Sequence, residues 1–289
     1  MCKIIVNIII FCITYFLYPL KGEVNFIEQN KYIFKIDLYH QFKSGNVIQG
    51  ITSINNLWLV SQTNHNKKII FSFLDKNGKV VKHQIIDYPS HGQDLSIKRI
   101  SKNLFYIITS SKNNNGIAIF KFNTKNNNII FYKDITLLGK GFNTPTISKD
   151  EKFIAVKNCN RIDIYFFKDL LNNYKKPTYS FFLDKIQQKK FQWFQGIVMN
   201  KGYIYCLSGN NKINAPKYLI IYNYLGDIIK KYSLNIGRKF ALKEGNKWEL
   251  EGLTIKNNKL YTTVMTGKNG HNIKRLYQIL EIKCKNTFI

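Results

Sequence analysis

A pattern repeated five times along the chain is the feature that most limits its fold. Each copy opens with an amide or acid residue and continues as a short apolar strand. A polar turn and a second strand, rich in aromatic and β-branched residues, follow. Evenly spaced units of this kind are typical of repeat architectures. The five copies cover residues 48–62, 92–111, 142–158, 194–209 and 250–267.

Each copy is followed by a further pair of strand-like segments, so one unit holds about four strands. The clearest pair surrounds the turn Lys76-Asn77-Gly78, a hairpin signal. Helical periodicity is confined to residues 168–173. Four-stranded units of roughly 40–50 residues indicate a β-propeller. We therefore predict an all-β five-bladed β-propeller over residues 23–289, with a β-sandwich as the competing fold.

The two ends of the chain complete one unit. The fifth unit has one further strand after its repeat, at residues 275–283, and lacks a fourth. Residues 31–42 (KYIFKIDLYHQF) supply a strand of the right character. Pairing this N-terminal strand into the last blade would close the ring and remove an exposed sheet edge.

The net charge of +27 first suggests a nucleic-acid ligand. Only four basic residues are arginines, however, and the other 40 are lysines scattered mostly as pairs. Arginine is the side chain suited to bidentate phosphate and guanine contacts. We therefore expect no nucleic acid as partner, and expect the charge to attract anionic polymers through the field of the whole protein.

The N-terminal residues 1–22 read as a signal peptide or a signal anchor. Lys3 precedes an apolar stretch at residues 4–17, which is shorter than the roughly 20 residues of a membrane-spanning helix. We expect a secreted or cell-surface protein, a monomer with possible membrane or wall association. Of the five cysteines, three follow this segment without close spacing, so we expect no metal site, and no motif indicates a cofactor.

Two of the repeats carry a family resemblance. The segments Phe194-Gln195-Gly196-Ile197 and Trp248-Glu249-Leu250-Glu251-Gly252-Leu253, each leading to a tyrosine-containing strand, resemble the repeats of a five-bladed propeller family. That family includes helveticin-J-type bacteriocins, teichoic acid biosynthesis protein C and receptor-binding proteins of some staphylococcal phages. The second unit departs from the pattern with Asp94 in place of glycine, and the third with Thr144-Pro145. The resemblance implies recognition of a cell-surface glycopolymer or a secreted antibacterial role.

The residues that open the repeats are the candidate ligand-binding residues, because inner strands of a propeller line its central channel. A ring of amides with one carboxylate would suit sugar hydroxyls, although such residues also form buried hydrogen-bond networks. Glu249 lies two residues before Glu251 and adds a second carboxylate. Trp193 and Trp248 could stack on sugar rings or pack between blades. The candidates are Gln49, Gln93, Asn143, Gln195, Glu249, Glu251, Trp193 and Trp248.

The predicted function is that of a secreted, non-catalytic propeller that recognises a cell-surface glycan or an anionic polymer such as teichoic acid. A bacteriocin-like or adhesive role fits this prediction. The alternative is a secreted hydrolase of a polysaccharide or lactone, for which Glu249 and Glu251 would be the candidate acids. Long loops on a rigid scaffold often carry binding sites. We expect such loops at residues 168–192 and 235–248, and place the recognition face on the fourth and fifth blades.

Overall fold

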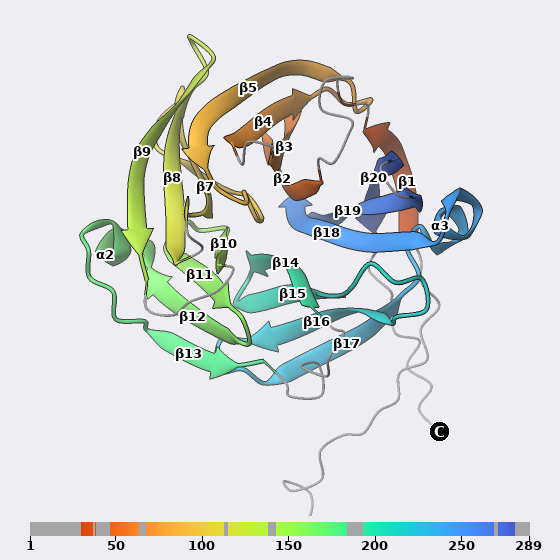
Figure 1. Ribbon diagram of the computed structural model, residues 1–289. Coiled ribbons are helices and arrows are strands. Elements are labelled where there is room, and N and C mark those ends of the chain that lie inside the picture. Colours follow the sequence, from red (N-terminus) through yellow and green to blue (C-terminus); the bar gives the residue numbers. More distant parts are fainter. Residues whose placement is uncertain are drawn as a thin grey trace, which may run out of the picture.

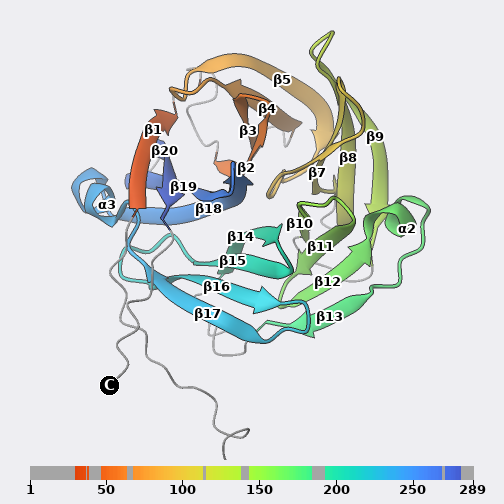
Figure 2. The ribbon, with the colours of Figure 1, turned by 180° about the vertical axis from the view of Figure 1, so that it is seen from behind.

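The chain forms a ring of five four-stranded antiparallel sheets, as predicted from the repeats (Figure 1). The computed structural model describes residues 30–36, 38, 47–63, 68–112, 115–137, 143–183, 193–268 and 271–280. Each repeat supplies the first and second strands of one sheet, and the first strand lies nearest the axis of the ring (Figure 2). All five blades therefore have the same antiparallel strand order from the axis outward.

The blades follow the order of the sequence, and the strands of each blade are named from the innermost outward. Blade 1 comprises β2 (Ile48–Ile54), β3 (Leu57–Thr63), β4 (Lys68–Leu74) and β5 (Val80–Pro89). Blade 2 comprises β6 (Ser96–Arg99), β7 (Leu104–Ser110), β8 (Gly116–Asn123) and β9 (Asn128–Thr136). Blade 3 comprises β10 (Asn143–Ile147), β11 (Phe153–Asn158), β12 (Arg161–Phe166) and β13 (Tyr179–Phe182). Blade 4 comprises β14 (Trp193–Asn200), β15 (Tyr203–Gly209), β16 (Lys217–Asn223) and β17 (Ile228–Leu234). Blade 5 comprises β18 (Lys247–Lys256), β19 (Lys259–Lys268), β20 (His271–Ile279) and β1 (Asn30–Ile36).

The ring closes through blade 5, as the two chain ends predicted. Strand β1 pairs antiparallel with β20, from Asn30 opposite Ile279 to Ile36 opposite Lys274. Apart from Leu38, the rest of the predicted strand at residues 37–42 lies outside the described residues. The joint with blade 1 is packed by Trp58, whose ring lies 6.3 Å from that of Phe34 and 4.9 Å from that of Tyr261. Closure therefore adds both backbone hydrogen bonds and apolar burial.

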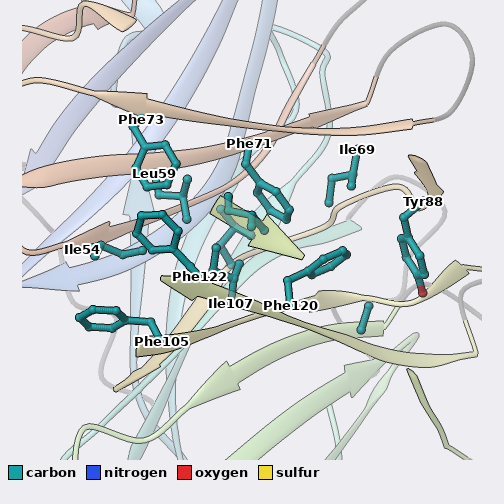
Figure 3. Packing of buried hydrophobic residues seen from close by; sticks show 13 residues of the cluster. Ile54, Leu59, Ile69, Phe71, Phe73, Tyr88, Phe105, Ile107, Phe120 and Phe122 are labelled. Carbon is teal, nitrogen blue, oxygen red and sulfur yellow. The ribbon is translucent and has the colours of Figure 1, made fainter. Parts of the chain in front are cut away.

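Aromatic side chains fill the wedges between several neighbouring blades. Between blades 1 and 2, Phe71 packs edge to face on Phe120 at 5.2 Å between ring centroids, within a cluster of buried rings and aliphatic side chains (Figure 3). Between blades 3 and 4, the rings of Phe181 and Tyr222 lie 5.5 Å apart. The wedge shape of the interface suits large rings, which bury much area and pack in specific geometries.

The two segments expected as long loops contain regular structure, which corrects that prediction. Residues 168–192 hold most of the short helix α2 (Phe167–Leu171) and all of β13, because β12 requires an outer partner. Residues 235–248 hold helix α3 (Arg238–Glu244), bracketed by Gly237 and Gly245 in left-handed conformations. Glu244 at its end forms an ion pair with Arg275 of β20, which attaches the helix to blade 5.

The predicted signal segment, residues 1–22, lies outside the described residues. Within the part of the chain that is described, no helix is both long and apolar enough to cross a membrane.

Candidate binding site at the mouth of the propeller axis

The inner strands meet at the axis through the residues that follow the repeat-opening positions. A Cβ built on Gly50 of blade 1 would lie 2.5 Å from the carbonyl carbon of Asp94 in blade 2. One built on Gly252 of blade 5 would lie 2.9 Å from Gly50 Cα, and one on Gly196 of blade 4 would lie 2.8 Å from Leu253 N. Strands β2, β14 and β18 each change register here, as β-bulges do. The glycines therefore let four blades touch backbone to backbone.

Asp94 of blade 2 occupies the position that is glycine in blades 1, 4 and 5. Its carboxylate connects strands of different blades. The side chain is completely buried. Its Oδ1 accepts the Leu95 N–H at 2.9 Å, and its Oδ2 accepts the Ile197 N–H of blade 4 at 2.8 Å. The Asp94 N–H donates to Gln49 O of blade 1 at 2.9 Å. The departure from the repeat pattern thus links blades 1, 2 and 4 across the axis.

Lys157 in blade 3 is a buried cation that the sequence did not single out. Only 4% of the residue is exposed, and its Nζ donates to Phe194 O of blade 4 at 3.0 Å. Asp94 is close enough to stabilise its charge, although burial dominates and lowers the pKa of Lys157. In the sequence, the one indication of this burial is that Lys157 directly follows the apolar run Phe153–Val156.

The repeat-opening residues lie at the same ends of the inner strands but differ in exposure. Asn143 is 1% exposed and accepts a hydrogen bond from Asn158 Nδ2 at 3.0 Å. Gln93 is 8% exposed, and its side-chain oxygen has no hydrogen-bond partner among the described residues. We call this side of the ring the mouth; of these four residues, Gln49 and Gln195 are partly exposed there.

Blades 4 and 5 contribute a charged group at this mouth, which we call the mouth cluster and define as Gln195, Lys247, Glu249 and Glu251. Gln195 Nε2 donates to Glu249 Oε1 at 2.9 Å across the two blades. Lys247 Nζ lies 3.8 Å from Glu249 Oε2. Glu251 is 5% exposed and close enough to Glu249 for their charges to repel. The cluster thus combines two buried carboxyl groups with the partly exposed Gln195 and Lys247.

The two candidate tryptophans are not equivalent. Trp248 is 2% exposed, donates its indole N–H to Ile236 O at 2.7 Å and lies 4.4 Å below Lys217 Nζ. It therefore packs between blades 4 and 5, the alternative considered for it, and its ring faces are covered. Trp193 lies at the start of β14, and its side chain is outside the described part of the structure.

The loops around the mouth cluster are tied to one another. Lys212 forms an isolated β-bridge with Lys247, and the Trp248 N–H donates to Asn211 O at 3.0 Å. Lys217 Nζ donates to Lys212 O and Ala215 O, both at 3.0 Å, which holds the loop at residues 210–216 in shape. These contacts join the loop at residues 210–216 to the start of β18.

Burial shifts the pKa values of the two carboxyl groups in the mouth cluster. It raises the pKa of Glu251 well above its usual value, and the neighbouring Glu249 carboxylate adds to the effect while Lys247 opposes it. Burial also raises the pKa of Glu249, against the pull of Lys247, Lys217 and Gln195. Between the ordinary carboxyl pKa and these raised values, the folded protein binds more protons than the unfolded chain. The contribution of these two carboxyl groups to the free energy of unfolding therefore falls as pH rises through that interval, while the lowered pKa of His91 acts in the opposite direction below its ordinary value.

Replacing Glu251 by glutamine should make the protein more stable at pH 7.5 and flatten its stability profile between pH 5 and pH 7.5. The gain should be about 1.4 kcal/mol for each unit by which burial and Glu249 raise the carboxyl pKa. Urea unfolding at a series of pH values measures both effects. Parallel profiles for the variant and the wild type would contradict the assignment. Burial lowers the pKa values of Lys217 and Lys274 to about 8, so these lysines change the free energy of unfolding only above this pH range.

The fold and the site together define a five-bladed propeller whose inner strands touch near the axis and whose polar cluster joins blades 4 and 5. The chain belongs to the family described as the phage 5-bladed beta propeller receptor binding platform domain, which matches residues 48–279. Comparison with curated protein sequences gives no match.

Solved structures share this fold. The tail fiber of Staphylococcus aureus phage P68 superposes with a TM-score of 0.69 at 18% identity, over 95% of this chain and 56% of that one. This chain thus spans little more than half the length of that fiber. An exo-β-1,3-galactanase from Phanerochaete chrysosporium has a TM-score of 0.52 at 10% identity, over 81% of this chain and 64% of that one. A GH43 β-1,3-galactosidase has a TM-score of 0.52 at 9% identity, over 82% of this chain and 91% of that one. At these identities the likeness concerns the fold alone.

Proposed function

We propose that this propeller binds a glycopolymer of a host cell surface, without catalysis, and that the mouth cluster makes the specific contacts. Membership of a receptor-binding platform family supports binding as the role. The hydrogen bond from Gln195 to Glu249 is the observation that carries the location, because it holds polar groups of two blades together. Secretion and cell-surface localisation remain part of this proposal.

The charge of the protein supports an anionic polymer as the ligand, teichoic acid being one example. The net charge is +27, and the exposed Lys212 pairs through its backbone with Lys247 of the mouth cluster. Such a field raises the local concentration of an anionic chain and its association rate. The mouth cluster would then select for the hydroxyl pattern of the sugar or polyol.

The position of Asp94 supports a non-catalytic role. Glycoside hydrolysis requires two carboxyl groups placed on either side of the scissile bond. The Asp94 carboxylate is buried and bound by backbone N–H groups, so it is not available to a substrate. The Glu249 and Glu251 pair lies on a single strand, with Glu249 held by Gln195.

Binding to purified wall polymers tests the proposal. We expect Lys247→Gln and Gln195→Leu to weaken binding of polyribitol phosphate or polyglycerol phosphate about tenfold, as loss of a charged or buried polar contact does. Lys98→Gln is the matched control for Lys247→Gln, since Lys98 also pairs with a glutamate but lies at the far end of an inner strand. Equal effects of the two lysine variants would place the site elsewhere, and release of cleaved polymer during incubation would favour the hydrolase alternative.

A further inference from the structure

A groove of about 560 Å³ separates blades 4 and 5 on the side of the ring opposite the mouth. It runs from the turns that follow β14 and β18 toward the outer strand β17. Three tyrosines, Tyr203, Tyr205 and Tyr232, and several aliphatic side chains form its walls. Its volume lies in the range of about 300–1,000 Å³ that is usual for sites of small ligands.

Trp248 fills the wedge between blades 4 and 5 beside the start of β18, whereas the groove lies at the other end of that strand. Paired rings cross the interfaces of blades 1 and 2, blades 3 and 4, and blades 5 and 1. Among the described side chains, no ring of blade 4 pairs with a ring of blade 5. The aliphatic residues Leu219, Ile255 and Leu260 line the groove.

The polar groups of the groove favour an anionic ligand that also carries hydroxyl groups. Its charged lining residues are all lysines, Lys201, Lys230 and Lys259, with no acid among them. The side-chain oxygen of Asn200 is buried in the wall of the groove and has no hydrogen-bond partner in the described structure. An unsatisfied buried acceptor of this kind calls for a donor, which a ligand hydroxyl would provide.

We propose that the groove between blades 4 and 5 binds a sugar ring that bears one phosphate or carboxylate group. Tyrosine rings and aliphatic side chains would cover the apolar faces of the sugar. Asn200 would accept a hydroxyl hydrogen, and the lysine ammonium groups would hold the anionic substituent. This site is separate from the mouth cluster and goes beyond the proposed function.

Calorimetric titration with glucose 6-phosphate and glucuronate, beside glucose and inorganic phosphate, tests the proposal. We expect both anionic sugars to bind at least fivefold more tightly than either glucose or phosphate alone. Lys230→Gln should weaken binding of the anionic sugars at least threefold, whereas Lys175→Gln, at a likewise exposed lysine on blade 3, should not. Lys247→Gln at the mouth should leave this binding unchanged.

A variant that fills the groove tests the binding site without changing the charge of the protein. Ile229 lines the groove and is 45% exposed, so Ile229→Trp should fill the space and abolish binding. Ile85→Trp is the matched control, because Ile85 is also 45% exposed on an outermost strand, that of blade 1. Binding that survives Ile229→Trp, or equal affinity for glucose 6-phosphate and inorganic phosphate, would overturn the assignment.

Discussion

Replacing Gly50 by alanine should destabilise the propeller by about 3 kcal/mol or more, the upper part of the range for overpacked cores. The new methyl group would lie 2.5 Å from the carbonyl carbon and 2.6 Å from the Cα of Asp94, and 2.8 Å from Leu95 N. All three are backbone atoms, so no side chain can rotate away. Relief would require blades 1 and 2 to separate at the axis. Urea unfolding at constant pH measures the loss.

Gly252→Ala should behave similarly, and Gly202→Ala provides the control. A Cβ on Gly252 would meet Ile51 N at 2.7 Å and Gly50 Cα at 2.9 Å. Gly202 has open space around it but a φ of 83°, so alanine there should cost about 1 kcal/mol from backbone strain alone. If Gly50→Ala and Gly202→Ala cost the same, close contact at the axis does not govern stability.

The sequence was sufficient to predict the fold because the repeat encodes it at every level. Alternating strands, hairpin turns and unit length all indicate four-stranded blades, and the incomplete fifth unit indicates the closing strand β1. The glycine after the repeat-opening residue was visible as a pattern. Its reason became apparent only when the backbones of Gly50 and Gly252 were found in contact, since a sequence does not show which blades touch.

The site was predictable only in part, because burial of polar side chains depends on partners far away in the chain. Lys157 was one of the scattered lysines of the sequence, yet its Nζ donates to the carbonyl oxygen of Phe194, 37 residues later. Trp248 was a candidate platform, yet it lies in the core because the loop before β18 folds back over it. The groove between blades 4 and 5 depends on which side chains meet across the two blades, and the repeat pattern does not show this.

Replacing Asp94 by alanine should destabilise the propeller by about 2–6 kcal/mol, at about 1–3 kcal/mol for each of the two buried N–H groups that lose their acceptor. The variant would leave the N–H groups of Leu95 and Ile197 without their acceptor in a site closed to water. It would also remove the residue that links blade 2 to blade 4 across the axis. Asp94→Asn should cost less, about 1.5–3 kcal/mol, because the amide keeps one acceptor oxygen. Asparagine also tolerates the left-handed backbone of this position, where φ is 54°.

A double-mutant cycle separates the role of the carboxylate from mere loss of volume. Burial raises the pKa of Asp94 well above its usual value, while the N–H groups of Ile197 and Leu95 and the charge of Lys157 lower it. If the Asp94 and Lys157 charges support one another, Asp94→Ala combined with Lys157→Met should cost at least about 1 kcal/mol less than the sum of the single variants. Strict additivity would mean that Asp94 holds the blades through its backbone contacts alone. Non-additivity would instead identify a charged pair at the axis as the element that fixes the spacing of blades 2, 3 and 4, and with it the geometry of the mouth.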